Sequence, residues 1–316
     1  MGATMGVAMG RLFKVMAVPL LLIGLTAAHE KSNREEEDLL GPVRSVSTQM
    51  SSRLMGVGPG EPEAEGRPQQ QDLAVYDARG NAVERTVHDD HGFPVGTEVN
   101  KRDPDGHLVE TILSDPKGAL VGRYVHVYVG GKVAETVHYD REGKVFLREV
   151  NSYGEQARLR EVTYRTGSKA VGKTVYRYDS AGRRSETTFY MPDGSKAIAP
   201  IGPCLGAHRI TFTYDNKGRP HEAVSYEPNG AMKKSWVYGY NDKGLLSEEK
   251  LEDSYDHTTK THVYKYDSRG NWIKRTSTVI RRPKADRLSA EERKQYPGLM
   301  ATSEKRVTIG RTITYH

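Results

Sequence analysis

The chain has 316 residues, of which 36% are hydrophobic and 28% charged, and it contains 32 glycines, 15 prolines and 18 tyrosines. This polar, turn-rich composition disfavours a helical bundle and a multi-span membrane protein, and it favours many short strands. The single cysteine excludes an internal disulfide framework and a zinc site built on thiolates. The net charge of +6 comes from 47 basic and 41 acidic residues that are interspersed along the chain, so we expect a mixed-charge surface and no nucleic-acid partner.

Residues 1–28 have the three parts of a secretory signal peptide. Arg11 and Lys14 precede an apolar run at residues 15–28, and the sequence then becomes polar. The run of about 14 residues is short for a membrane-spanning helix, which needs about 20. Cleavage is predicted after Ala28, with an uncleaved anchor as the alternative. The predicted location is therefore the periplasm, the cell envelope or the extracellular space, with membrane contact only through this segment.

Three short segments follow the signal. Residues 29–41 are charged and predicted to be flexible. Residues 42–49 alternate weakly between apolar and polar, which predicts a first strand. Residues 50–72 are rich in Gly, Pro and Gln and predict a disordered loop.

Residues 73–280 consist of one repeated unit. Its turn glycines recur mostly every 11 to 15 residues, and in the clearest stretch Gly218, Gly244 and Gly270 lie 26 residues apart. Each unit places two aromatic residues on one strand face and then an Asp-x-x-Gly turn, in which Asp accepts a backbone hydrogen bond and Gly takes the left-handed conformation. The predicted turn residues are Asp77, Gly80, Asp179, Gly182, Asp215, Gly218, Gly244, Asp267 and Gly270.

The pattern Tyr-Asp-x-x-Gly followed by Asn or Arg, as at residues 76–81 and 266–271, resembles the YD repeat of RHS-type and teneurin-type proteins. The resemblance covers roughly residues 73–275. It implies an all-β fold, a repetitive antiparallel hairpin meander that curls on itself, of a kind that bacteria export. Large RHS proteins build a shell of such sheet around a toxin. This chain is much shorter and has no evident toxin or self-cleavage segment, so it is more similar to small, signal-bearing YD-repeat proteins of bacterial envelopes.

One insertion interrupts the repeat. Gly182 and Gly218 lie 36 residues apart, and the excess falls in residues 197–208, which contain Cys204. Long loops on rigid sheets often carry binding residues, and a neutral surface insertion is the alternative. Cys204 and His208 do not have the spacing of a nucleophile and its base in such a loop.

The C-terminal part continues the sheet. Residues 281–303 predict a loop with a short helix from a capping box at Ser289 to about Tyr296. Residues 304–316 predict a closing strand with Val307, Ile309, Arg311, Ile313 and Tyr315 on one face. This strand could pair with residues 272–280 or cover an open sheet edge.

The sequence contains no serine-hydrolase, phosphate-loop or zinc-protease motif, and no catalytic residue, metal or cofactor is predicted. The cluster at residues 88–91 lies where a hairpin turn belongs, and residues 103–106 lack the later acidic ligand of a calcium loop. Five aromatic residues could bind a ligand if their shared face is exposed, and otherwise form a core ladder: Tyr178, Tyr214, Tyr240, Tyr266 and Trp272.

These observations favour an exported, non-enzymatic β-repeat protein that acts as a binding or structural module at the cell envelope or outside the cell. The partner is unknown, and a carbohydrate or another envelope or secreted protein would fit. One alternative is a carbohydrate-binding protein that uses the tyrosine face or the 197–208 loop. The other is a hydrolase with dispersed acidic residues.

Overall fold

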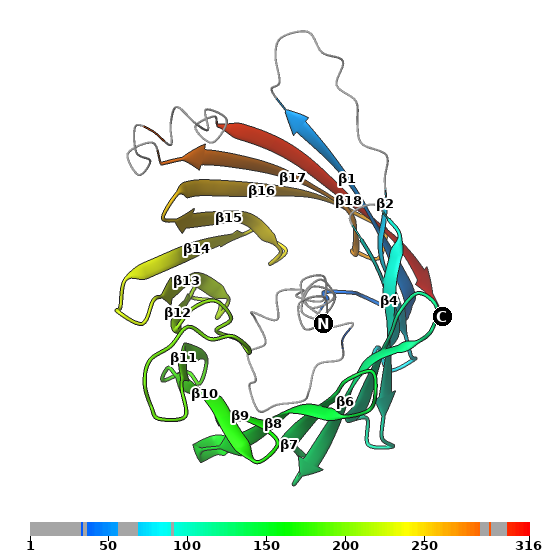
Figure 1. Cartoon of the computed structure of the whole chain (residues 1–316). Coiled ribbons are helices and arrows are strands. Elements are labelled where there is room, and N and C mark those ends of the chain that lie inside the picture. Colours follow the sequence, from blue (N-terminus) through cyan, green and yellow to red (C-terminus); the bar gives the residue numbers. More distant parts are fainter. Residues whose placement is uncertain (1–32, 34–36, 56–68, 90–91, 285–290, 292–301) are drawn as a thin grey trace.

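The computed structural model describes residues 33, 37–55, 69–89, 92–284, 291 and 302–316 (Figure 1). They form one antiparallel sheet of 18 strands. The strands are β1 (Val43–Met55), β2 (Gln69–Tyr76), β3 (Ala82–His88), β4 (Pro94–Arg102), β5 (Leu108–Ser114), β6 (Leu120–Val129), β7 (Lys132–Tyr139), β8 (Val145–Tyr153), β9 (Leu159–Thr166), β10 (Lys169–Tyr178), β11 (Arg184–Tyr190), β12 (Arg209–Tyr214), β13 (Pro220–Tyr226), β14 (Met232–Tyr240), β15 (Leu246–Asp253), β16 (Asp256–Tyr266), β17 (Trp272–Pro283) and β18 (Ser303–Tyr315). A 3₁₀ turn at Glu155–Ala157 joins β8 to β9.

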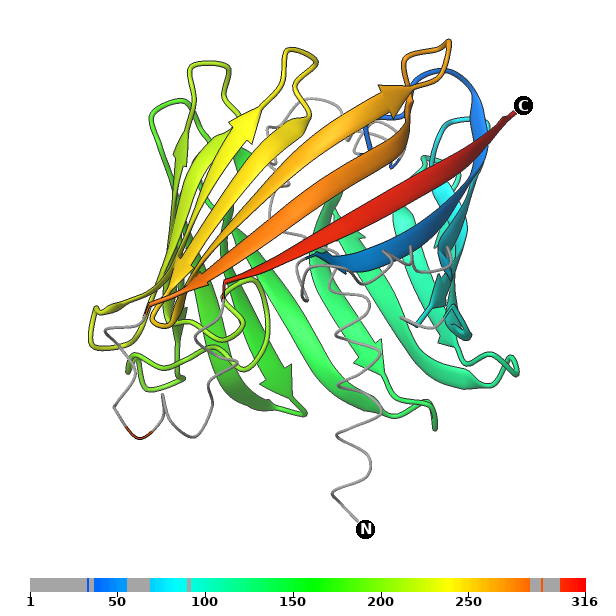
Figure 2. The same cartoon turned by 90° about the horizontal axis from the view of Figure 1, so that it is seen from above.

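The sheet closes into a barrel. Every strand pairs with the next one in the chain, and β1 pairs with both β2 and β18 (Figures 1 and 2). The closing strand β18 therefore pairs with β17 and also covers the edge of β1. We call the junction of β18, β1 and β2 the seam. Closure leaves no strand edge unpaired there.

Two boundaries near the seam differ from those expected. β1 runs to Met55 rather than to residue 49, because β18 pairs with it along its length. β2 begins at Gln69, inside the expected loop 50–72, and residues 56–68 of that loop lie outside the described residues. The signal segment 1–28 also lies outside them.

The helix predicted from Ser289 to about Tyr296 is not among the elements of the described residues, and of this segment only Glu291 is described. β17 and β18 are the two arms of a hairpin that pairs as far as Arg281 and Ser303, so this part of the chain belongs to the sheet. In the parts of the chain that the structure describes, no helix is long and apolar enough to cross a membrane.

The inner face of the barrel is identified by the chain that precedes β1. Figures 1 and 2 place this blue segment inside the ring, where Leu39 packs against Ala74 and Tyr76. Because side chains alternate along a strand and paired residues share a face, the inner face can be followed around the barrel. It includes Val46, Ala74, Arg85, Glu98, Leu113, Tyr124, His138, Glu149, Tyr164, Thr174, Phe189, Ile210, Ala223, Trp236, Leu251, Lys260, Ser277 and Ile309.

The inner face carries two apolar clusters. One lies at the seam, where Leu39, Val43, Val46, Ala74, Tyr76 and Ala82 are buried together. The other lies on β9 to β13, where Tyr164, Tyr176, Phe189 and Ile210 are covered by the connection between β11 and β12. Each cluster thus combines the barrel wall with a segment that packs against it from inside.

Candidate functional site

The predicted Asp-x-x-Gly turns, which begin at Asp77, Asp179, Asp215 and Asp267, all join strands at the same rim of the barrel. At Asp215 the carboxylate accepts hydrogen bonds from the backbone N–H groups of Lys217 (2.9 Å) and Arg219 (2.8 Å). The N–H of Gly218 donates to the Asp215 carbonyl at 3.0 Å, and the φ of this glycine is +78°. The turns that begin at Asp77, Asp179 and Asp267 make the same backbone bonds, and the φ values of Gly80, Gly182, Gly244 and Gly270 lie between +82° and +90°.

The tyrosines before these turns lie on the inner face beside that rim. The hydroxyls of Tyr178, Tyr214 and Tyr240 each donate at 2.7 Å to the carbonyl of a residue in an earlier strand: Leu159, Arg184 and Pro220. The hydroxyl of Tyr266 instead accepts a hydrogen bond from the Asn241 amide at 3.4 Å. These hydroxyl contacts join each hairpin to an earlier one.

A cation from the preceding turn covers one face of each of these rings. The guanidinium of Arg183 lies 4.6 Å from the ring centre of Tyr214, and that of Arg219 lies 4.3 Å from Tyr240. Arg158 covers Tyr178 in the same way, and Lys243 covers Tyr266. Arg183 and Arg219 are themselves held by the turn carboxylates Asp179 and Asp215. The tyrosines therefore do not present an open aromatic platform on the face that the cation occupies.

Trp272 differs from these tyrosines because it is buried, with 8% of its surface exposed. It packs edge-on against Tyr264 on the inner face. The Arg311 guanidinium lies 3.6 Å from its ring centre.

The 197–208 loop is part of the second core cluster rather than a surface insertion. Ala199, Cys204 and Ala207 are buried in it, and the Cys204 thiol donates a hydrogen bond to the Thr187 carbonyl at 3.3 Å. Burial raises the pKa of Cys204 to about 12, which keeps the thiol protonated and unreactive at neutral pH. The loop closes on itself through the Ala199 N–H, which donates to the Ala207 carbonyl at 2.8 Å.

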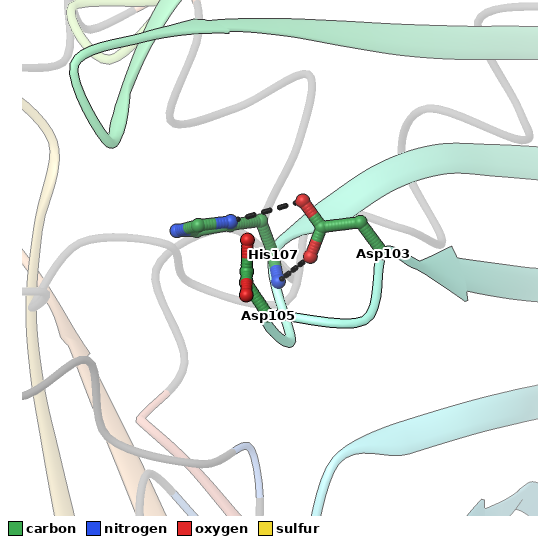
Figure 3. Close-up of side chains that lie close together, drawn as sticks. All are labelled: Asp103, Asp105 and His107. Carbon is green, nitrogen blue, oxygen red and sulfur yellow. Dashed lines mark hydrogen bonds and ion pairs between the residues drawn. The ribbon is translucent and has the colours of Figure 1, made fainter.

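Within the described residues, one group of side chains has the spacing of metal ligands: Asp103, Asp105 and His107, in the turn between β4 and β5 (Figure 3). Both oxygens of Asp103 already bind the turn itself, one the backbone N–H of His107 at 2.8 Å and the other its imidazole at 3.0 Å. The close approach is therefore explained by the hairpin. In the cluster at residues 88–91, Asp90 and His91 lie outside the described residues.

The sequence did not indicate the polar groups that the structure gathers on the inner face of β6 to β8. Tyr124 packs edge-on against His138, whose Nε2 lies 3.1 Å from a Glu149 oxygen. Burial, with the nearby Glu98 and Glu149 carboxylates, raises the pKa of Tyr124 to about 12. Burial and the neighbouring His138 lower the pKa of His126. The visible signal was the alternation of Tyr124 and His126 on one strand, but it does not distinguish an inner from an outer face.

The outer face carries paired charges instead. Glu110 lies between Lys101 (2.8 Å) and Arg123 (3.1 Å), and Glu186 lies between Arg177 (3.3 Å) and Arg209 (3.2 Å). Two further pairs, Glu135 with Arg148 and Glu161 with Lys173, continue this pattern on β7 to β10. On β6 to β8, Tyr124, His126 and His138 thus lie inside, and the pairs of Arg or Lys with Glu lie outside.

No family model matches the sequence, and no curated protein matches it. Among solved structures, the chain is similar to a porin-like protein from Bacteroides uniformis ATCC 8492, with 12% identity over 86% of this chain and 96% of that chain and a TM-score of 0.38. It is also similar to part of TcdB2-TccC3-TEV, with 12% identity over 70% of this chain and 17% of that chain and a TM-score of 0.29. For the Photorhabdus luminescens Tc holotoxin pore the identity is 9%, over 82% of this chain and 19% of that chain, with a TM-score of 0.26. The chain spans under a fifth of the last two, and these similarities concern the β-rich fold alone.

Proposed function

We propose that this protein is an exported, non-enzymatic binding module of the cell envelope or the extracellular space, and that it binds its partner on the inner face of the barrel. The contrast between the two faces supports this. Charged groups of the outer face neutralise one another in pairs such as Glu135 with Arg148 (2.8 Å). The inner face of β6 to β8 instead presents half-buried aromatic, imidazole and carboxylate groups, which are typical of ligand sites.

Carbohydrate is the second candidate partner. The rim tyrosines support it less than the sequence suggested, because cations cover their rings. The inner face of β4 to β6 supports it better, since Asn100 and Thr111 hydrogen-bond to each other at 2.7 Å near Tyr124. Amides and hydroxyls beside an aromatic ring are suited to binding sugar hydroxyls.

The test is to apply the labelled mature chain, residues 29–316, to arrays of glycans and envelope proteins. His126→Ala changes the inner face, and Arg148→Ala is the matched control on the outer face. We expect the inner substitution to weaken a positive signal at least tenfold and the outer one to leave it within twofold. Loss of binding with Arg148→Ala alone would contradict the proposal.

Export is tested separately, by expressing the full chain in a bacterium and sequencing its N-terminus by mass spectrometry. The expected product begins near His29, as the signal pattern predicts. An intact N-terminus recovered from the cytoplasm would contradict the exported location.

A further inference from the structure

Two guanidinium groups lie near the same indole ring on the inner face of β17 and β18. The Arg311 guanidinium is 3.6 Å from the ring centre of Trp272, and the Arg275 guanidinium is 5.7 Å from it. Tyr264 packs edge-on against Trp272, with its ring centre 5.9 Å from that of Trp272. Two like charges are therefore held together on an apolar, aromatic surface.

Several N–H groups of these arginines have no acceptor among the residues that the structure describes. The Nε of Arg275 and both Nε and Nη1 of Arg311 are buried without a hydrogen-bond partner. A buried donor without an acceptor is destabilising, and a buried charged donor more so. Each of the two residues as a whole nevertheless keeps intermediate exposure.

Three other basic groups of the inner face have carboxylate partners. Arg85 pairs with Glu37, Lys260 pairs with Glu249, and Arg281 pairs with Asp256 at 2.7 Å. Among the described residues, neither Arg275 nor Arg311 forms an ion pair with a carboxylate, and unlike the exposed Lys305 of the same inner face both are partly buried.

The charge of Arg311 is not fully compensated by its surroundings. Burial and the neighbouring Arg275 lower the pKa of Arg311 to about 10, although Glu37, Tyr76 and Asp38 act in the opposite direction. Burial and Arg275 also lower the pKa of His262, to about 4, so this imidazole is neutral at pH 7 and adds no charge. A negatively charged ligand would relieve this imbalance.

We propose that Arg275 and Arg311, stacked on Trp272, form a binding site for an oxyanion, the carboxylate or phosphate group of a small ligand. The fork of a guanidinium matches the two oxygens of either group. The inference rests on the proposed function, because it gives the ligand chemistry of the inner face on which the protein is proposed to bind.

The test uses the mature chain and three probes: glucuronate, glucose 1-phosphate and glucose. The chain has two tryptophans, Trp236 and Trp272, both on the inner face, so intrinsic fluorescence reports binding there, and calorimetry gives the affinity. We expect both anionic probes to bind, and glucose to bind at least tenfold more weakly. A preference for one anion identifies a carboxylate or a phosphate as the natural group.

Arg311→Gln is expected to weaken binding of the anionic probes at least tenfold. Arg306→Gln, which removes an exposed cation of the same strand on the outer face, should leave it within twofold. If Arg311→Gln does not fold, as judged by its melting transition, Arg275→Gln is the second variant with the same expectation. Equal binding of glucose, no binding of either anion, or unchanged affinity in a folded variant would overturn the proposal. If the array instead shows binding of a neutral partner, and His126→Ala weakens that binding, the proposed function holds and the oxyanion site does not.

Discussion

Asn271 is predicted to hold the seam together, although it is a turn residue like several others. Its side chain is fully buried, at 0% exposure. Its amide oxygen accepts a hydrogen bond from the Leu40 N–H at 2.5 Å, and its amide nitrogen donates to the Leu40 carbonyl and to the Tyr315 hydroxyl, both at 2.9 Å. One side chain thus connects the turn after β16, the segment inside the barrel and the end of β18.

Asn271→Ala removes these three hydrogen bonds and leaves both backbone groups of Leu40 without that partner. Each such bond contributes about 1 kcal/mol, and a buried group left unpaired costs about 1–3 kcal/mol. The Tyr315 hydroxyl keeps a partner because it also donates to Asp267 at 2.6 Å. We therefore expect the free energy of unfolding to fall by about 2–4 kcal/mol.

The matched control is Asn81→Ala. Asn81 follows Gly80 as Asn271 follows Gly270, but among the described residues its side chain donates only to Asp77 of its own turn, at 3.1 Å. Loss of this hydrogen bond should lower the free energy of unfolding by about 1 kcal/mol or less. Chemical denaturation of the two variants and the wild type, followed by circular dichroism, gives the comparison. Equal destabilisation by the two substitutions would refute the special role of Asn271 at the seam.

Three further perturbations have definite expected outcomes. Gly244→Val should lower the free energy of unfolding by about 1–2 kcal/mol because the φ of Gly244 is +84°. Lys243→Ala, at an exposed position that contacts the ring of Tyr266, should lower it by about 0.5 kcal/mol or less, and thermal melts compare the two. Tyr240→Phe should lower the free energy of unfolding by about 1 kcal/mol, because it removes the hydrogen bond to the Pro220 carbonyl. Tyr240→Ala should lower it by about 2–3 kcal/mol, and an equal loss in both variants would mean that the ring itself contributes nothing. Burial, with Glu37 and Glu98 adding to it and Arg85 opposing it, raises the pKa of Asp72 to about 6, so the folded chain binds this proton more tightly than the unfolded chain. The stabilising contribution of this protonation is present below about pH 4 and is lost as the pH rises through about 6. Asp72→Asn should therefore raise the free energy of unfolding at pH 8 by up to about 3 kcal/mol and change it little at pH 4. A lower free energy of unfolding of this variant at pH 8 would contradict the prediction.

The repeat could be predicted from sequence because its determinants are local. A turn such as Asp215 to Gly218 uses hydrogen bonds between residues no more than four positions apart, so the residue types alone indicate it. The alternation of Tyr238 and Tyr240 likewise places both rings on one strand face. All-β, antiparallel, repetitive architecture follows from these short-range patterns, and the structure confirms it.

Features that depend on distant residues could not be predicted. Closure requires β1 and β18 to pair although they lie at opposite ends of the chain. The charged segment 29–41, which the sequence predicts to be flexible, supplies Leu39 and Leu40 to the seam. Arg311 did give a local signal, as the one charged residue among Val307, Ile309 and Ile313 on its strand face. Its meaning became visible only when Trp272 and Arg275 were placed beside it.

An inner face exists only if the barrel is closed, and a designed disulfide at the seam tests this most directly. Ser45 on β1 and Thr314 on β18 are paired on the outer face, and their hydroxyls lie 2.7 Å apart. Residues paired in this way are close enough to be bridged when both are cysteine. After mild oxidation, the double variant Ser45→Cys, Thr314→Cys should form an intramolecular disulfide in nearly all molecules, as detected by mass spectrometry. The control variant Ser45→Cys, Thr278→Cys places the two cysteines on non-adjacent strands and should not form one. Failure of the first pair to cross-link in the folded protein, with both thiols free to react with a maleimide, would contradict the closed barrel and the inner binding face with it.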